Sequence, residues 1–289
     1  MKRTGSDLTS ASVKIIITML IFGSIGLVRR NIPYSSAMIA FFRGAVAVVI
    51  LAVLRLFDRS GIDMPAIKKN LLPLIVSGVF IGVNWILLFE AYRFTTIAVA
   101  TISYYMAPVF TVIASVFILK EKLTVRKAVC VMVAVIGMVF VSGVIEDGVG
   151  GLKGVLLGMG AALLYAGDVI INKLVKGVDG RDRTIIQMGA AALAVLPYWL
   201  MNENFSSLTF SLQPVIMLLV AAVICTALPY SLYFSAIQHV PTQSAAMLSY
   251  IDPVVAVLIS ALVLGEGMSA LTLAGIVLGI GAAMASETG

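Results

Sequence analysis

The chain has 289 residues, of which 61% are hydrophobic and only 12% are charged, and its formal net charge is +6. This balance excludes a soluble globular protein, in which about a quarter of the residues are charged. The basic residues stand in short clusters between apolar runs, which is typical of the signals that orient membrane helices and argues against nucleic acid as a partner. We therefore expect a protein of the lipid bilayer.

Ten apolar runs follow one another with short connections, and each is close to the ~20 residues that a membrane-spanning helix needs. They cover residues 13–29, 33–57, 71–92, 96–119, 124–143, 152–172, 184–201, 212–236, 242–264 and 269–286. The sequence thus predicts an all-α integral membrane fold of ten transmembrane helices. Arg29 and Arg30 stand where a signal peptide would need small residues for cleavage, so we expect the first helix to be retained.

The fourth and ninth runs belong to an internal repeat. Residues 87–121 match residues 232–266 at a shift of 145 residues, with 11 of 35 positions identical. The identical positions include Tyr105/Tyr250, Pro108/Pro253 and Glu121/Glu266. We predict two copies of one five-helix unit, residues 1–147 and 148–289. Each repeated Glu precedes a helix, where we expect it to cap the helix or to form a salt bridge.

The basic residues also predict the orientation of the chain. With both termini in the cytoplasm, the inner segments hold 15 of the 20 Lys and Arg residues and the outer segments hold four, while Arg43 lies inside the second run. The positive-inside rule therefore places both termini on the cytoplasmic side of the cytoplasmic membrane. Five helices per copy is an odd number, so the second copy must be inverted. In agreement, the basic loop Lys120–Lys127 corresponds to Gly265–Ser269, which has no basic residue.

Two motifs carry a family resemblance: AYRFTTIAVATISYYMAPVFTVIASVFILKEKL and AIQHVPTQSAAMLSYIDPVVAVLISALVLGE. Both are similar to the repeated pattern of the ten-helix EamA-like permeases in the drug/metabolite transporter superfamily. The resemblance implies a secondary transporter that moves a small organic solute across the cytoplasmic membrane. It does not imply which solute, because members export or import amino acids, sugars, nucleotides and drugs. We expect an exporter of a small metabolite (an amino acid, an amine or a drug-like solute) that works by alternating access and has no cofactor. The resemblance also implies a cavity near the midplane, lined mainly by helices one, three, four, six, eight and nine.

Four charged residues fall inside the apolar runs, where a charge costs about 2.5–3.5 kcal/mol and calls for a partner or a water-filled cavity. They are Arg43, Glu90, Asp168 and Asp252. For Arg43 we expect an internal ion pair, with Asp252 as one candidate partner, in preference to binding a substrate carboxylate. Asp252 precedes Pro253, so its role is either a polar contact with substrate or satisfaction of the backbone groups that the proline frees.

Glu90 distinguishes the first copy from the second, which has Ser235 at the corresponding place. It lies three residues before Arg93, so a salt bridge at the rim is the alternative to a role in the cavity. We predict that Glu90 faces the cavity and binds a cationic group or a coupling proton.

Asp168 shares one helical face with Tyr165 and Asn172. A polar stripe on an apolar helix must face protein or water. The alternative is a charge contact with Lys173 or Lys176 near the inner rim. We predict that Asp168, like Glu90, is a carboxylate of the cavity.

Aromatic residues complete the predicted site, because a mostly apolar pocket with a few polar groups is typical of small-molecule sites. For any single aromatic residue, packing is the alternative. The predicted substrate-binding residues are Glu90, Asp168, Trp85, Tyr104, Tyr105, Tyr165, Tyr230, Tyr250 and Asp252.

A second class of function is an intramembrane aspartyl-type enzyme. Ala166-Gly167-Asp168 and Tyr250-Ile251-Asp252 have a weak similarity to the aspartate motifs of such enzymes. The sequence contains no HExxH, no Walker motif and no Cys/His cluster. We therefore expect no catalytic residue and no metal site.

Overall fold

The computed structural model describes residues 5–57, 62–95, 100, 103–141, 145, 151–203, 205, 208, 211–264 and 269–287. The regular secondary structure of these residues is helical, and short turns and irregular segments connect the helices. Lipid offers no hydrogen-bond partner to the backbone, so a spanning segment must satisfy its own N–H and C=O groups, as a helix does. Large apolar side chains such as Leu56, Phe117 and Leu262 are exposed on the surface of the bundle, as residues that face lipid are.

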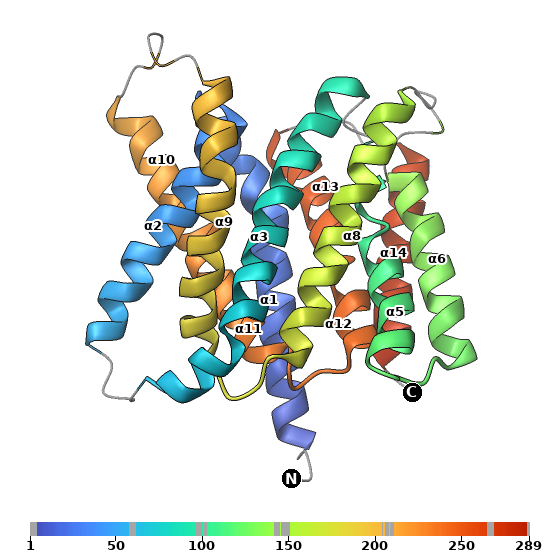
Figure 1. The fold of residues 1–289 in the computed structure, drawn as a ribbon. Coiled ribbons are helices and arrows are strands. Elements are labelled where there is room, and N and C mark those ends of the chain that lie inside the picture. Colours follow the sequence, from blue (N-terminus) through green and yellow to red (C-terminus); the bar gives the residue numbers. More distant parts are fainter. Residues whose placement is uncertain are drawn as a thin grey trace.

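The first half of the chain forms helices that run back and forth across the bundle (Figure 1). They are α1 (Gly5–Arg30), α2 (Ser36–Leu56), α3 (Met64–Phe94), α5 (Ala107–Ile118) and α6 (Val125–Val141). Side chains cap two of them at the N-terminus. Ser35 Oγ accepts a hydrogen bond from the Met38 N–H at 3.1 Å, and the Asp63 carboxylate accepts one from the Ala66 N–H at 2.9 Å.

The second half repeats this course. Its helices are α8 (Leu152–Leu174), α9 (Gly180–Asn202), α10 (Leu212–Ala222), α11 (Leu228–Ala236), α12 (Thr242–Leu248), α13 (Ile251–Leu264) and α14 (Ala270–Glu287). A π-helical turn, η2 (Val223–Ala227), joins α10 to α11, so these three elements form one span. The elements α12 and α13 form the next span.

Five of these spans, α2, α3, α8, α9 and α10–α11, are each long and apolar enough to cross a membrane. Shorter apolar helical stretches cover Thr9–Ile25, Ala107–Ile118 and Leu273–Ala282 in α1, α5 and α14. With α6 and α12–α13 they complete the ten transmembrane helices that the sequence predicts.

Helix positions follow the repeat through the whole chain, beyond the segment in which residues are identical. Adding 145 to the bounds of α2 gives 181–201, and α9 is Gly180–Asn202. The same shift moves α6 to 270–286, and α14 is Ala270–Glu287. The predicted boundary between the copies, at 147/148, and Glu266 both lie outside the described residues.

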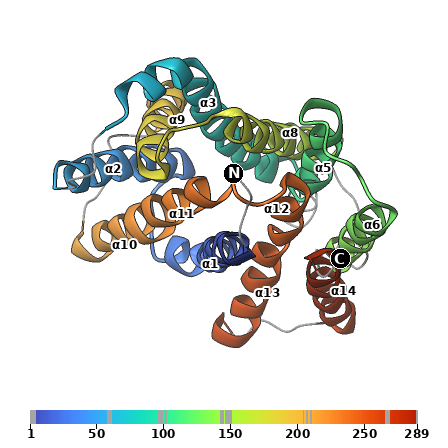
Figure 2. The same cartoon turned by 90° about the horizontal axis from the view of Figure 1, so that it is seen from below.

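Contacts between helices follow the repeat as well: when each helix is replaced by its counterpart in the other half, the same pairs are in contact. The pair α3 and α8 is in contact, and so is its counterpart pair, α11 and α1; the same holds for α5 with α8 and α13 with α1. In the pairs α2–α9 and α6–α14, each helix packs against its own counterpart from the other half. Figure 2 shows these two pairs at opposite ends of the bundle. This packing is that of two units related by a pseudo-twofold axis. Because each unit has an odd number of helices, the two units cross the membrane in opposite directions and form an inverted repeat.

Small residues allow close approach of the helices in the pairs α2–α9 and α6–α14. A Cβ atom added at Gly44 would lie 3.1 Å from the Ala192 Cβ in α9. In the other pair, a Cβ atom at Gly137 would lie 2.9 Å from the Gly275 carbonyl oxygen. Small residues at such crossings are the usual means by which membrane helices pack.

Both ends of the chain lie on one side of the bundle, at the lower edge of Figure 1. We call this the terminus side. The connection from α5 to α6 lies on the terminus side, whereas α14 begins at the opposite side. Of the corresponding loop Gly265–Ser269, only Ser269 falls within the described residues.

The repeat also includes a break inside one span of each half. Tyr105 and Met106 form a turn immediately before α5, and Ser249 and Tyr250 form a turn between α12 and α13. Pro108 and Pro253 follow these turns and have no N–H to donate. Each break places polar backbone groups inside the bundle.

Candidate functional site

A cavity of about 710 Å³ lies inside the bundle, between helices of both halves. Its volume falls in the range of about 300–1,000 Å³ that is typical of small-molecule sites. At one end it is lined by Ser249 and Asp252, beside the break before α13. From there it extends toward the ends of α1 and α3 that are distant from the terminus side, where Ile32 and Tyr92 line it.

Aromatic side chains make much of the wall. The ring of Tyr104 lies 5.9 Å from that of Tyr105 and 6.1 Å from that of Tyr165, and the rings of Phe22 and Tyr230 are 5.2 Å apart. Five of the six aromatic residues in the predicted site therefore line the cavity. They are Trp85, Tyr104, Tyr105, Tyr165 and Tyr230.

Tyr250 is the sixth, and it does not line the cavity. Its side chain is 1% exposed and packs in a cluster with Met138 of α6 and Ile276 of α14. Tyr105 packs against the same cluster, so both repeat partners face the interior, as the alignment predicts. Only Tyr105 also reaches the cavity.

Arg43 lines the cavity and is held by two contacts. Its Nε–H donates a hydrogen bond to Thr226 Oγ1 at 2.8 Å, and its guanidinium lies 5.1 Å from the centre of the Trp85 ring, within reach of a cation–π attraction. Thr226 belongs to the π-helical turn η2 and donates its own hydroxyl hydrogen to the Ala221 carbonyl at 2.8 Å. Such turns are frequent at functional sites. No sequence signal marks Thr226, because the turn forms in an ordinary apolar run.

Asp252 lines the same cavity from α13. Its backbone is close to α1, since a Cβ atom added at Gly23 would lie 2.5 Å from the Asp252 carbonyl oxygen. Among the described residues, no ion pair or side-chain hydrogen bond engages its carboxylate. Its own carboxylate is therefore open to a ligand.

The predicted ion pair between Arg43 and Asp252 is not formed. The two residues sit on helices with different neighbours: α2 packs on α9 and η2, whereas α13 packs on α1. A cation and an anion consequently face one cavity without neutralising each other.

Glu90 does not line the cavity, contrary to the prediction. Its carboxylate pairs with Arg93 at 2.9 Å and accepts a hydrogen bond from the Tyr198 hydroxyl of α9. The salt bridge at i, i+3 that was the alternative is therefore formed. The Glu90 side chain is 19% exposed and that of Arg93 is 65% exposed.

Asp168 also lies off the cavity, in a buried polar network between α3, α8 and α9. Its carboxylate accepts hydrogen bonds from the Ser77 hydroxyl and from Asn172 Nδ2, the latter at 2.9 Å. Gln187 Nε2 of α9 donates in turn to Asn172 Oδ1 at 2.9 Å. Tyr165 shares the predicted face but points to the cavity, because it sits nearly one turn earlier on α8.

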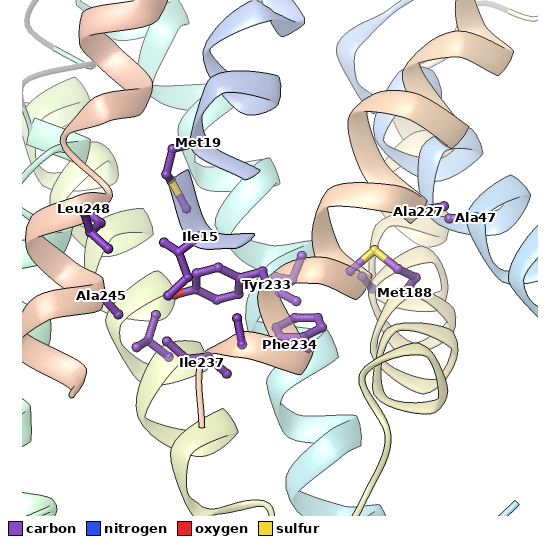
Figure 3. Packing of buried hydrophobic residues seen from close by; sticks show 14 of the residues in the cluster. Ile15, Met19, Ala47, Met188, Ala227, Tyr233, Phe234, Ile237, Ala245 and Leu248 are labelled. Atoms are coloured by element: carbon purple, nitrogen blue, oxygen red, sulfur yellow. The ribbon is translucent and has the colours of Figure 1, made fainter. Parts of the chain in front are cut away.

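The cavity is closed on the terminus side by packed side chains. Figure 3 shows Ile15 of α1, Tyr233 and Ile237 near the end of α11, and Ala245 and Leu248 of α12 meeting in one cluster. Tyr165 and Tyr230, which line the cavity, pack against this cluster. The cluster therefore forms the floor of the cavity.

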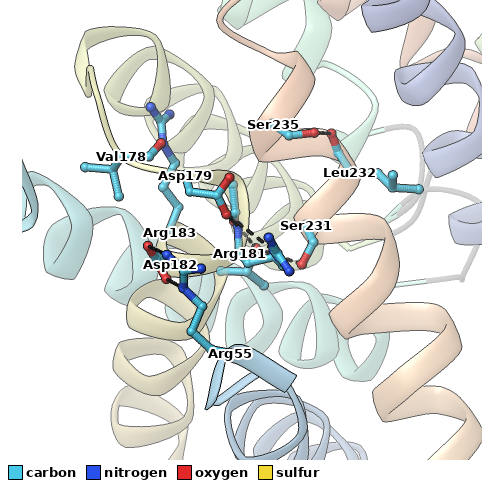
Figure 4. Close-up of polar contacts among 11 residues, drawn as sticks. Arg55, Val178, Asp179, Arg181, Asp182, Arg183, Ser231, Leu232 and Ser235 are labelled. Carbon is cyan, nitrogen blue, oxygen red and sulfur yellow. Dashed lines mark hydrogen bonds and ion pairs between the residues drawn. The ribbon is translucent and has the colours of Figure 1, made fainter. Parts of the chain in front are cut away.

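Buried charges join helix ends on the terminus side (Figure 4). Arg55 donates two hydrogen bonds to the Asp182 carboxylate, at 2.8 and 3.1 Å, and both side chains are nearly buried. The Arg183 guanidinium donates to three backbone carbonyls between residues 172 and 178. The sequence predicts these arginines as orientation signals, and they also fasten α2, α8 and α9 together.

Glu121 acts as a cap, but for a helix of the other half. Its carboxylate accepts hydrogen bonds from the backbone N–H of Thr242 at 3.0 Å and from the Thr242 hydroxyl at 2.7 Å. It thereby ties the end of α5 to the beginning of α12, beneath the floor of the cavity.

The sequence profile of the EamA-like transporter family matches the chain twice, over residues 9–143 and 152–286. The chain belongs to this family. It is a multi-pass membrane transporter that acts on small molecules, so the alternative of an intramembrane aspartyl-type enzyme is wrong. The geometry agrees, because Asp252 lines the cavity whereas Asp168 is enclosed by Ser77 and Asn172.

Several named proteins resemble this EamA-like transporter. The uncharacterized transporter YxxF of Bacillus subtilis is 26% identical over 262 residues, which are 89% of this chain and 83% of that protein. A probable amino-acid metabolite efflux pump of Salmonella typhimurium is 26% identical over 58% of this chain and 60% of its own. Mouse solute carrier family 35 member G1 is 30% identical over 49% of this chain and 41% of its own. One solved crystal structure, 16% identical, superposes with a TM-score of 0.83 over 96% of this chain and 98% of that chain, a likeness of fold.

Proposed function

We propose that this transporter exports small zwitterionic metabolites of the amino-acid type across the cytoplasmic membrane by alternating access. The observation that carries the proposal is the pair of opposite charges, Arg43 and Asp252, which line one cavity without pairing. A guanidinium binds a carboxylate well, and a carboxylate binds an ammonium group. A zwitterion would satisfy both side chains at once, whereas a simple amine or a simple acid would leave one charge uncompensated in a site of low dielectric.

The rest of the cavity suits the side chain of such a substrate. Trp85, Tyr104 and Tyr165 supply flat, mostly apolar surface, on which apolar or aromatic substituents can pack. The name of the Salmonella typhimurium relative, a probable amino-acid metabolite efflux pump, supports both the substrate class and the outward direction.

The terminus side is proposed to face the cytoplasm. Arg55, Lys122, Lys173 and Arg183 are among the many basic residues gathered there, as the positive-inside rule expects. The cavity extends away from that side, and the cluster that includes Tyr233, Ile237 and Leu248 closes it toward the terminus side. This conformer is then the outward-facing one, and exchange of the conformations of the two halves would open the cytoplasmic side.

Asp252 is also our candidate for a coupling proton. A carboxylate that no protein cation neutralises can be neutralised by the ammonium group of the substrate or by a proton, but not by both together. Competition for one carboxylate would couple export of substrate to entry of protons. Glu90 has Arg93 and Tyr198 as partners and is not assigned this role.

The test uses the purified transporter in liposomes. Counterflow is measured for three matched solutes: a neutral amino acid, the amine that lacks its carboxylate and the acid that lacks its amino group. We expect saturable exchange of the amino acid, with the other two solutes weaker by about 10-fold or more. Equal exchange of all three, or preference for a singly charged solute, would reject the zwitterion as substrate.

A further inference from the structure

A second concavity, of about 610 Å³, lies on the terminus side of the bundle. It is formed where the end of α5, the beginning of α6, the end of α8 and the turn between α11 and α12 meet. We call it the basic pocket, because four lysines line it. They are Lys122, Lys127, Lys173 and Lys176.

Little negative charge balances these lysines. Among the described residues that line the pocket, Glu121 is the one carboxylate, and it already accepts hydrogen bonds from the backbone N–H and the hydroxyl of Thr242. Within the described part of the chain, no carboxylate pairs with Lys122, Lys127 or Lys176.

A buried amide at the wall of this pocket has no hydrogen-bond partner among the described residues. Gln243 lines the pocket and is 1% exposed, yet neither its side-chain oxygen nor its side-chain nitrogen has a hydrogen-bond partner among the described residues. Leaving a buried polar group without a partner is unfavourable, because the group has lost its hydrogen bonds to water and gained none in return. Lys173 Nζ already donates a hydrogen bond to the Val240 carbonyl. A ligand with acceptor oxygens would satisfy the Gln243 NH₂ group together with the ammonium groups of Lys122, Lys127 and Lys176.

Orientation signals alone do not explain this pocket. The positive-inside rule requires basic residues on the cytoplasmic face, but it does not require lysines from two distant segments, 122–127 and 173–176, to converge on one hollow. Other arginines of the same face are matched within the protein: Arg55 by Asp182 at 2.8 Å, and Arg181 by Asp179 at 3.5 Å.

We propose that the basic pocket binds a phosphate-bearing anion, either a free phosphate compound or the headgroup of an anionic phospholipid. Lysine is a common binder of phosphate, and several lysines can neutralise a dianion. The lining comes from both halves of the chain, so the anion would bridge α6, α8 and α12. It would therefore favour the conformer in which this side is closed.

The test uses the full-length protein in detergent and in nanodiscs. Thermal unfolding is followed in sodium phosphate and in sodium chloride of equal ionic strength, and native mass spectrometry compares retained phosphatidylglycerol with retained phosphatidylcholine. The pocket variant is the double substitution Lys122→Gln and Lys127→Gln. The control is Lys68→Gln and Lys69→Gln, two exposed lysines at the start of α3 that do not line the pocket.

We expect the wild type and the control to bind one of the two sources, and the pocket variant to bind it about 10-fold or more weakly. Stabilisation by phosphate identifies a soluble anion, and selective retention of phosphatidylglycerol without that stabilisation identifies a lipid headgroup. Binding of neither source, or an equal loss in the control, would overturn the proposal. Should the pocket variant fail to fold, the single substitution Lys176→Gln, whose side chain is exposed, carries the same comparison.

Discussion

Arg43 on α2 and Asp252 on α13 line one cavity from opposite halves of the chain, and they do not pair with each other. Arg43 is instead oriented by Thr226 and lies over the Trp85 ring. Both charges remain open to a ligand. This relationship is the basis of the first two predictions.

Arg43→Gln should weaken binding of an amino acid substrate by about 10–100-fold, because a charge-assisted hydrogen bond is worth about 1.5–3 kcal/mol. The amine that lacks the carboxylate should be bound as well as before or better, since the repulsive guanidinium is gone. Counterflow of both solutes in liposomes measures the difference. An equal loss for both would show that Arg43 maintains the cavity without contacting the substrate.

Asp252→Asn should abolish coupling to protons and weaken binding of every solute that carries an ammonium group. The measurement is substrate-driven pH change inside liposomes that contain a pH-sensitive dye. Glu90→Gln is the matched control, because Glu90 is a carboxylate of the same protein that lies off the cavity beside Arg93. Proton movement lost in Glu90→Gln but retained in Asp252→Asn would reverse the assignment.

Gly23→Ala should destabilise the protein by about 1–3 kcal/mol, the usual cost of overpacking. The added Cβ atom would lie 2.5 Å from the Asp252 carbonyl oxygen and 2.7 Å from Val255 Cβ, so α1 and α13 would have to separate. Thermal unfolding in detergent should show a lower midpoint, and transport should fall because Asp252 moves. Gly281→Ala is the control, since nothing lies within 4 Å of its added Cβ; a similar decrease in both variants would contradict the prediction.

Asp182→Asn should cost about 3–5 kcal/mol, because it removes the ion pair that the buried guanidinium of Arg55 forms with Asp182. Asp179→Asn should cost less than about 1 kcal/mol, since its contact with Arg181 is exposed and an asparagine can still cap α9. Denaturation midpoints of the two variants test the contrast. Equal midpoints would mean that the Arg55–Asp182 pair adds nothing to stability.

Labelling of single cysteines should place the two loops of the repeat on opposite sides of the membrane. In a background with Cys130 and Cys225 replaced, a cysteine at Ser269 should react with an impermeant maleimide added to intact cells, whereas one at Lys122 should react only after the cells are permeabilised. The physical reason is the inverted repeat together with the positive-inside rule. Reaction of both positions from the same side would contradict the inverted arrangement.

The sequence alone predicted the ten helices, the shift of 145 residues and the inversion. An apolar run must become a helix in lipid because the backbone has no other partner there, and two copies of one pattern pack by one set of contacts. Five of the six aromatic residues named from the sequence, among them Trp85, Tyr104 and Tyr165, line the cavity.

Only the tertiary structure decided which polar side chains reach the cavity. Glu90, Asp168 and Asp252 are all carboxylates within apolar runs. In the structure, Ser77 and Asn172 donate hydrogen bonds to Asp168, and Arg93 neutralises Glu90. The neighbours of a polar group depend on the rotation of each helix and on which helix packs beside it, and neither is encoded in the local pattern of residues. The π-helical turn that carries Thr226, the hydrogen-bond acceptor of Arg43, likewise has no local signature, because its residues lie within an ordinary apolar run.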